Sequence, residues 1–116
     1  MADVLVDTDV FVDHLRGHAR FDPGPDRVLY SVVTRAELFA GAGANEAVIR
    51  KLLEPFAEVP VEREIAEAAG TLRRAVGVSL PDALIGASAL SRGATLLTRN
   101  RRDFDRIPGL KVRAPR

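Results

Sequence analysis

The sequence predicts an α/β protein in which helices cover both faces of a central parallel sheet of about five strands, a three-layer α/β/α arrangement. Short apolar runs with the character of strands alternate with segments of helical spacing along the whole chain, a pattern typical of parallel sheets. The 116 residues are enough for one domain and too few for two, so residues 1–116 are expected to form a single unit. Apolar residues make up 47% of the chain, which suffices for a buried core.

Five segments have the character of buried strands. Each is short, rich in valine or leucine, and bounded by polar or turn-forming residues. They are 3–7, 27–33, 57–61, 94–98 and 110–113. Because helical segments separate them, these strands are expected to run parallel, with each connection crossing a face of the sheet.

Helical spacing of apolar residues marks the segments between the strands. Six helices are expected, at 8–17, 34–42, 45–56, 62–76, 81–93 and 100–107. The segment 62–76 begins with acidic residues and ends near arginines, which the helix dipole favours. The segment 81–93 is apolar almost all round, which predicts a helix buried against the sheet.

Composition excludes several classes of protein. The chain has no cysteine and therefore neither disulfides nor a thiolate metal site. No apolar run approaches the roughly 20 residues of a membrane span. The start MADVLVDTD lacks the basic region of a secretory signal. A cytoplasmic protein with no membrane contact is therefore expected.

The net charge of +1 conceals an asymmetry along the chain. Residues 1–72 hold 7 basic and 13 acidic side chains, a net of −6, whereas residues 73–116 hold 10 basic and 3 acidic ones, a net of +7. Such a distribution can place a basic face for an anionic partner beside an acidic site. It can equally be that of an ordinary charged surface, and the asymmetry alone does not decide between the two.

Acidic or amide side chains stand at four places where a helix is expected to begin. They are Asp7, Glu37, Asp82 and the pair Asn100 and Asp103. Each could serve only its own helix, as an N-cap or within a capping box such as TRAE at 34–37 or SLPD at 79–82. Taken one at a time, capping is the simpler explanation for all of them except Asp7.

Taken together, these side chains predict a cation site. Three of the four places directly follow a strand, and the carboxyl ends of parallel strands share one edge of a sheet, where ligands bind. Carboxylates brought close together raise one another's pKa unless a cation lies among them. Oxygen ligands without His or Cys favour Mg²⁺ or Mn²⁺. Such ions lower the pKa of bound water and neutralise charge on a phosphoryl oxygen, and a basic half of the chain suits a phosphodiester substrate.

Other chemistries have less support. His14 and His18 lie in or after the first expected helix and are expected at the surface. The sequence contains neither a Ser-His-Asp arrangement nor a glycine-rich phosphate loop. Aromatic residues are few, Tyr30 and five Phe, so a base-stacking platform for nucleic acid is not expected.

These motifs resemble those of PIN-domain ribonucleases, and specifically the VapC toxins of bacterial toxin–antitoxin pairs. The matching stretches are VLVDTDVFVD, SVVTRAEL, LPDALIGASAL, ATLLTRNRRDF and IPGLKV, and they cover nearly the whole chain in this order. Each motif alone is loose, whereas their order and spacing together are fairly specific. The resemblance implies a PIN-like fold and PIN-like chemistry.

The resemblance also implies roles for individual residues. Asp7, Glu37 and Asp82 correspond to metal-binding acids of the family. Thr8, Asp9 and Thr98 correspond to positions that support the site. The fourth acidic position of the catalytic set falls at Asn100, where many relatives have Asp, and this departure leaves open whether one or two metal ions bind. Asp103 is expected to compensate from a neighbouring turn.

The implied activity is Mg²⁺- or Mn²⁺-dependent endonucleolytic cleavage of a structured RNA, tRNA or rRNA. Arg99, Arg101 and Arg102 are expected to contact RNA phosphates because of their charge and location. Relatives are homodimers that a cognate VapB antitoxin inhibits, so a homodimer and a toxin–antitoxin hetero-oligomer are expected. The helix pair 34–54 is a candidate for part of the antitoxin groove, through Leu38, Phe39, Ile49 and Leu52. Core packing is the simpler role for most of these four residues.

Three other protein classes share some of these features. A haloacid-dehalogenase-like phosphatase shares the DTD motif, but it requires Thr or Val where this chain has Phe11. It also requires a downstream Lys, and the only lysines of this chain are Lys51 and Lys111. A receiver-like domain requires an acceptor Asp after the third strand, where the sequence is EVPVE. A catalytically weak or inactive PIN scaffold that binds RNA or protein stays open because of Asn100.

Overall fold

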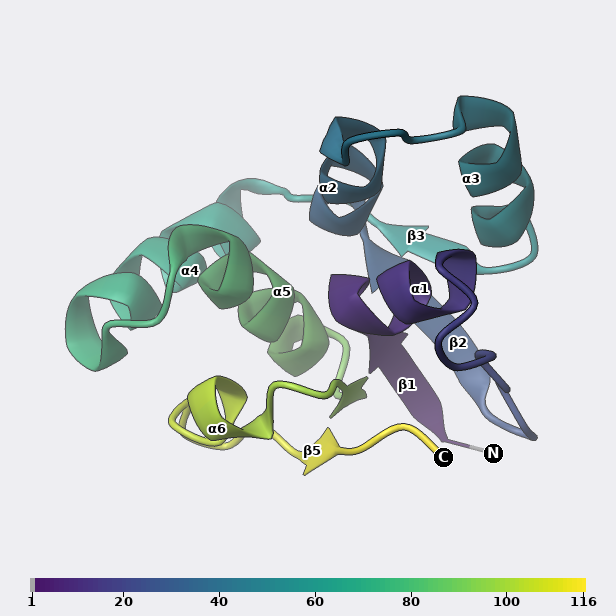
Figure 1. The fold of residues 1–116 in the computed structure, drawn as a ribbon. Helices are drawn as coiled ribbons and strands as arrows, with labels where there is room; N and C mark the ends of the chain where they lie inside the picture. Colours follow the sequence, from purple (N-terminus) through teal and green to yellow (C-terminus); the bar gives the residue numbers. More distant parts are fainter. Residues whose placement is uncertain (1) are drawn as a thin grey trace.

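The computed structural model describes residues 2–116, which form a five-stranded parallel sheet between two layers of helices (Figure 1). The strands are β1 (Asp3–Val6), β2 (Arg27–Ser31), β3 (Ala57–Val59), β4 (Thr95–Leu97) and β5 (Val112–Arg113). Their order in the sheet is β3-β2-β1-β4-β5. The helices are α1 (Thr8–Leu15), α2 (Val32–Ala40), α3 (Glu46–Leu53), α4 (Arg63–Val76), α5 (Leu80–Ser91) and α6 (Arg101–Phe104). The predicted three-layer α/β/α fold is confirmed.

Successive side chains of a strand point into two different cores, one on each face of the sheet. On the central strand β1, Val4 and Val6 face one core and Leu5 faces the other. The first core holds apolar residues of α1, α2 and α3, and the second holds those of α4, α5 and the segment around α6. Because both faces of a parallel sheet are buried, its strands are apolar at every position rather than at every second one. This explains the continuous apolar runs of the sequence.

The helix α5 is buried as predicted. Five consecutive residues, Ile85 to Ala89, are all buried, and the helix packs along α4. A Cβ atom on Gly86 would lie 2.6 Å from the Cδ1 atom of Ile107, so only glycine allows this approach without movement. The close packing fixes α5, and with it Asp82 in its first turn, against the rest of the domain.

The boundary between β2 and α2 differs from the prediction. The sequence predicted a strand to residue 33 and a helix from residue 34 with a TRAE capping box. In the structure the strand ends at Ser31, whose hydroxyl accepts a hydrogen bond from the Val33 N–H and caps a helix that begins at Val32. The predicted capping box is therefore wrong, and both Thr34 and Glu37 are free for other contacts.

No helix within residues 2–116 has the length and apolar character that a membrane crossing requires.

Candidate active site at the carboxyl edge of the sheet

The acidic residues singled out in the sequence meet in one pocket. It has a volume of about 300 Å³ and opens at the edge where β1, β2 and β4 end. Its lining residues are Asp7, Thr8, Asp9, Val12, Glu37, Asp82, Arg99 and Asn100. We call it the carboxylate pocket. Four carboxylates, from the starts of α1 and α5 and from within α2, therefore face a common space, as the topology of a parallel sheet predicts.

Asp7 is the most constrained of these carboxylates. Its Oδ1 atom accepts a hydrogen bond of 2.8 Å from the Thr8 N–H, which caps α1, and its Oδ2 atom accepts one of 2.7 Å from the Thr98 hydroxyl. The residue is only 5% exposed. Burial, followed by the charge of Asp9, raises the pKa of Asp7 to about 7, although both hydrogen bonds act to lower it. A buried carboxylate that remains so hard to ionise lacks a compensating positive charge.

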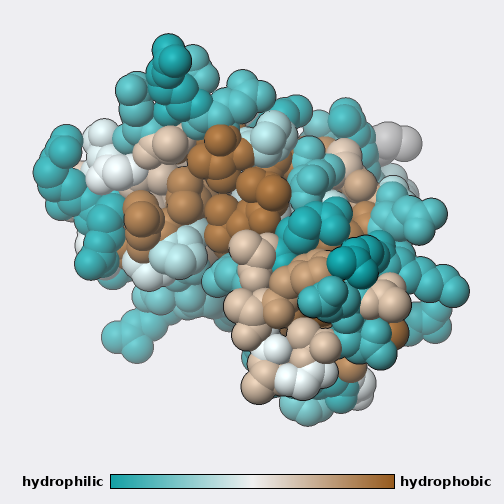
Figure 2. Space-filling model, turned by 90° about the horizontal axis from the view of Figure 1, so that it is seen from above, coloured by the Kyte–Doolittle hydropathy of each residue, from teal (hydrophilic) through white to brown (hydrophobic). Residues whose placement is uncertain are grey.

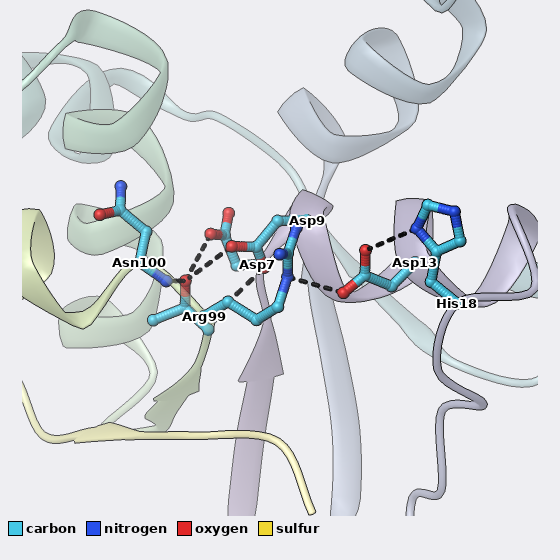
Figure 3. Close-up of polar contacts among 7 residues, drawn as sticks. Asp7, Asp9, Asp13, His18, Arg99 and Asn100 are labelled. Atoms are coloured by element: carbon cyan, nitrogen blue, oxygen red, sulfur yellow. Dashed lines mark hydrogen bonds and ion pairs between the residues drawn. The ribbon is translucent and has the colours of Figure 1, made fainter.

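Asp9 connects the pocket to a chain of polar contacts that runs along α1 (Figure 3). Burial raises the pKa of Asp9, and contacts with Arg99 lower it in part. The Nε atom of Arg99 lies 2.6 Å from Asp13, one turn further along the helix. Asp13 in turn lies 4.0 Å from His18. The only cation that lines the carboxylate pocket within residues 2–116 is therefore already paired with a carboxylate outside it.

Glu37 contacts the Thr8 hydroxyl, which also contacts the Thr34 hydroxyl. The sequence did not indicate this group of contacts. The Thr8 hydroxyl lies 2.6 Å from Glu37 Oε1 and 3.0 Å from the Thr34 hydroxyl. Thr34 is fully buried. Because α2 begins at Val32, Glu37 lies beyond the first turn of the helix and faces the pocket instead of capping it.

Asp82 stands in the first turn of α5, where Ser79 is the N-cap that accepts a hydrogen bond from the Asp82 N–H. Capping at SLPD is therefore as predicted, and Asp82 also lines the carboxylate pocket. Burial is the main reason that the pKa of Asp82 is raised. Three further carboxylate charges raise it as well, those of Asp103, Glu37 and Asp9. Neighbouring carboxylate charges thus raise the pKa of Asp82 as they raise that of Asp7.

Asn100 and Asp103 have different positions. Asn100 lines the pocket and caps α6 by accepting a hydrogen bond from the Asp103 N–H. Its amide also donates to Asp103 Oδ2 at 3.0 Å. Asp103 itself does not line the pocket, so it orients Asn100 and adds its charge near Asp82 from behind.

The three arginines expected at RNA phosphates separate in space. Arg99 lines the carboxylate pocket, and its side chain is 54% exposed. Arg101 and Arg102 lie in the first turn of α6, are exposed, and do not line this pocket. All three follow β4 at the same edge of the sheet. Only Arg99 lowers the pKa of a pocket carboxylate, that of Asp9, and it does so in part.

The donor atoms of the pocket fit a hard divalent cation. Every ligating group that lines it is an oxygen, and the pKa values of three carboxylates are raised. Within residues 2–116, no three carboxylate or imidazole groups are already close enough to hold one ion. Binding of Mg²⁺ or Mn²⁺ therefore requires side chains to rotate, for example Glu37 away from the Thr8 hydroxyl.

The histidines and Phe11 lie outside the pocket. His18 is exposed, as expected, whereas His14 is half-buried and its Nδ1 atom accepts a hydrogen bond from the Phe21 N–H. Phe11 is fully buried against Phe21 and Phe56. The position at which a dehalogenase-like phosphatase needs Thr or Val is therefore occupied by a core Phe.

Comparison with known proteins agrees with the fold and the order of the motifs. The sequence matches the PIN domain over residues 4–110. The chain belongs to the PIN-domain family. It is 32% identical to ribonuclease VapC19 of Mycobacterium tuberculosis, with 92% of this chain and 96% of that protein covered. It is 29% identical to the tRNA(fMet)-specific endonuclease VapC of Salmonella typhimurium, over 86% of this chain and 83% of that one.

A solved structure supports the same relationship. A chain in a toxin–antitoxin complex from Klebsiella pneumoniae superimposes on this PIN domain with a TM-score of 0.79 and 32% identity. The alignment covers 92% of this chain and 94% of the other. The resemblance to VapC proteins that the sequence motifs indicated is therefore confirmed.

A hollow of about 350 Å³ lies between α1, α2 and α3, next to the carboxylate pocket. Glu37 lines both spaces. Of the groove residues expected on the helix pair 34–54, Leu38 and Ile49 line this hollow but are almost fully buried in the core. Phe39 and Leu52 are half-buried and do not line it. The accessible apolar wall consists instead of residues such as Val48, which is 47% exposed.

A second apolar surface lies over α4 and α5, beside α2 (Figure 2). Leu80, at the start of α5, is 50% exposed. Half-buried apolar residues pack on the core below it, among them Val33, Val61 and Leu84. The surface lies within two residues of Asp82, so a partner covering it would stand close to the carboxylate pocket.

Proposed function

We propose that this PIN domain is the toxin of a VapBC-type pair, a metal-dependent endoribonuclease that cleaves a structured RNA. The observation that carries the proposal is the carboxylate pocket, where the pKa values of Asp7, Asp9 and Asp82 are all raised at one edge of the sheet. Carboxylates with raised pKa values that face one open space are expected where a cation binds. The tRNA-specific endonuclease of Salmonella typhimurium supports tRNA as the substrate class, with rRNA as the second candidate.

The residues of the pocket divide the work. Asp7 and Asp82 hold the ion, Mg²⁺ or Mn²⁺, and Glu37 helps to ligate it or to orient the attacking water. The ion, when bound, neutralises phosphoryl charge and makes bound water more acidic. Thr98 keeps the Asp7 carboxylate in place through its 2.7 Å hydrogen bond. Asn100 supplies a neutral donor and acceptor where many relatives have a fourth carboxylate.

Protonation of Asp7 limits the range of pH over which the pocket can work. Its pKa of about 7 in the ion-free protein means that the proton must leave before an ion binds. A bound cation favours the ionised form of the carboxylate. Activity at a fixed, low concentration of metal should therefore increase as the pH rises through 7.

Arginines of the segment that follows β4 position the RNA backbone. Arg99 stands at the pocket itself, and Arg101 and Arg102 extend the positive charge along α6. Their contacts are to phosphates and carry no sequence information, so the choice of RNA depends on its shape. The few aromatic residues of the domain are mostly part of the core, which agrees with recognition by backbone and shape.

Two protein partners accompany the proposed activity. A VapB-type antitoxin is expected to cover the hollow between α1, α2 and α3, because this hollow leads to Glu37 in the carboxylate pocket. A second copy of the chain is expected on the apolar surface over α4 and α5, to form a homodimer within the toxin–antitoxin hetero-oligomer. A protein that acts on RNA and is bound by an antitoxin is expected in the cytoplasm.

The proposal is tested with the purified, antitoxin-free protein, total RNA and Mg²⁺ or Mn²⁺. Discrete RNA fragments are expected, and they should disappear with EDTA and with Asp7→Asn. Asp105→Asn is the matched control, because Asp105 is exposed at the end of α6 and its side chain forms no hydrogen bond or ion pair with residues 2–116. Cleavage that survives Asp7→Asn would contradict the proposal. Binding of RNA without any cleavage would favour the inactive scaffold.

A further inference from the structure

A second polar pocket adjoins the carboxylate pocket. It has a volume of about 230 Å³ and lies between α1 with the loop that follows it, the end of β4, and the chain from β5 onward. Arg99 lines both pockets, so the two are direct neighbours. The charged residues that line the second one are Asp13, Arg20, Asp22, Arg99, Arg113 and Arg116. We call it the arginine pocket.

Carboxylates near this pocket pair with only a few of the N–H donors of its guanidinium groups. Each arginine carries five N–H donors. Asp26, just outside the pocket, pairs with the Nη2 atom of Arg113 at 2.9 Å and with that of Arg116 at 3.7 Å. These contacts involve one nitrogen of each arginine. Arg99 likewise uses only its Nε atom toward Asp13.

Two arginines have donors with no partner in the described part of the chain. Arg20 is exposed and forms no ion pair with residues 2–116. The Nε atom of Arg113 is buried and has no hydrogen-bond partner among residues 2–116. Buried donors are almost always satisfied in native proteins, so an exception in a charged pocket indicates a missing acceptor. An anion with several oxygens would supply one.

The rest of the pocket is apolar. Val10 and Leu97 line it, together with Phe21 and Pro115. Phosphate oxygens match the guanidinium forks, which bind them bidentately. Val10, Leu97 and Phe21 are almost fully buried, whereas Pro115 is half-buried and can pack against the ribose or the base attached to such a phosphate. A nucleotide therefore fits the chemistry of this pocket better than a free inorganic ion does.

We propose that the arginine pocket binds a phosphate of the RNA strand next to the scissile one, with Arg20, Arg113 and Arg116 as the contacts. The proposal rests on the ribonuclease function above. It favours RNA over an acidic protein segment because Arg99 is shared by both pockets, so that one strand can cross from the carboxylates to the arginines. It also separates this set from Arg101 and Arg102, which line neither pocket.

The test measures binding of a labelled single-stranded RNA of 12 nucleotides and mixed sequence by fluorescence anisotropy, in EDTA and at several salt concentrations. The double variant Arg20→Gln, Arg116→Gln should bind at least fivefold more weakly at low salt. The slope of log K against log salt should decrease by about 0.7, the value for one lost phosphate contact on a single strand. Arg113 is left in place here because it pairs with the poorly exposed Asp26.

Arg63→Gln is the matched control, an exposed arginine at the start of α4, away from both pockets. It should leave affinity and slope unchanged. Arg113→Lys keeps the charge but loses the Nε donor, and it should weaken binding without changing the slope. If the double variant binds RNA as the Arg63→Gln protein does, the RNA subsite is wrong and an acidic protein segment becomes the better ligand.

Failure of this inference can be told from failure of the proposed function by assaying cleavage of total RNA in Mg²⁺ with the same preparations. Cleavage by the unmodified protein together with unchanged affinity of the double variant overturns the arginine pocket alone. Weakened binding by the double variant, with no cleavage by the unmodified protein, overturns the ribonuclease and supports a phosphate site on an RNA-binding scaffold.

Discussion

Asp7 and Asp82 face the same pocket from the beginnings of two helices, but the fold holds them differently. Asp7 is 5% exposed and accepts hydrogen bonds from Thr8 and Thr98. Asp82 is half-buried, and its helix is capped by Ser79. Burial raises the pKa of both, and for Asp7 the value reaches about 7. The two residues proposed to bind one ion thus differ in how strongly burial disfavours their ionised form.

Asp7 is the carboxylate that lowers the stability of the folded protein more. Burial of a charge without a counter-charge is unfavourable, whereas a partly exposed carboxylate is still hydrated. Without a metal ion, Asp7 should therefore destabilise the folded state at neutral pH much more than Asp82 does.

The largest effect is expected on cleavage, where the two residues should behave alike. Asp7→Asn and Asp82→Asn should each reduce kcat by about a thousandfold or more, because several kcal/mol of charge stabilisation depend on the ion they hold. Initial rates on the RNA cut by the unmodified protein would measure this. Asp105→Asn should retain full activity. A variant at Asp82 that cleaves normally would remove it from the proposed ligands.

The next effect separates the two residues by stability. With EDTA at pH 8, Asp7→Asn should increase the free energy of unfolding by about 1–3 kcal/mol, because a pKa shift of one unit corresponds to 1.36 kcal/mol. The amide can still accept from the Thr8 N–H. Asp82→Asn should change stability by less than about 1 kcal/mol. Urea unfolding followed by circular dichroism would show the difference, and equal effects would contradict it.

The destabilisation caused by Asp7 should increase as the pH rises. Asp7 titrates at 3.8 when it is unfolded and at about 7 when it is folded. Between these values the folded protein binds more protons, so its contribution to stability is complete below pH 3.8 and is lost as the pH rises through 7. The unmodified protein in EDTA should therefore lose stability relative to Asp7→Asn between pH 5 and 8. A constant difference across this range would contradict the raised pKa.

A smaller effect is expected at Thr98. Thr98→Val removes the hydroxyl that donates to Asp7 at 2.7 Å and accepts from the Asn100 N–H at 2.9 Å. The loss should cost about 1.5–3 kcal/mol at pH 8, the range for a hydrogen bond to a charged group. Thr95→Val, on the same strand, is the matched control and should be nearly neutral. The cost at Thr98 should shrink below pH 6, where Asp7 is protonated.

The smallest effect is expected at Asn100. Asn100→Asp adds a carboxylate to the pocket and places it next to Asp103, whose contact with the Asn100 amide is then lost. The variant should be less stable by about 0.5–1 kcal/mol without metal and should bind Mn²⁺ several times more tightly. Calorimetric titration would measure the affinity. Unchanged binding of Mn²⁺ would mean that position 100 does not reach the ion.

The sequence predicted the sheet and all six helices because both periodicity and end signals agree. Ser79 and Pro81 mark the start of α5, and Gly77 ends α4 in the left-handed conformation. The boundary at Ser31 was missed because the residues after it, two valines, favour a strand, and packing overrides that propensity. The meeting of the acids at one edge followed from the parallel topology alone.

Contacts across the sheet edge could not be predicted. The pairing of Arg99 with Asp13 joins residues far apart in the chain, and nothing in the sequence selects one of many carboxylates. The hydroxyl contact between Thr8 and Thr34 depends on where α2 begins, which was placed two residues late. The position of Asp103 behind Asn100 depends on how α6 turns, and a helix of four residues has no pattern that fixes this.

The most direct measurement is calorimetric titration of Mn²⁺ into the unmodified protein at pH 6 and pH 8, beside Asp7→Asn and Asp105→Asn. We expect Mn²⁺ to bind more tightly at pH 8 than at pH 6, because Asp7 must first lose its proton. We also expect Asp7→Asn to abolish this binding. Asp105→Asn should bind as the unmodified protein does. Binding of equal strength at both pH values, or undiminished in Asp7→Asn, would contradict a cation site built on this carboxylate.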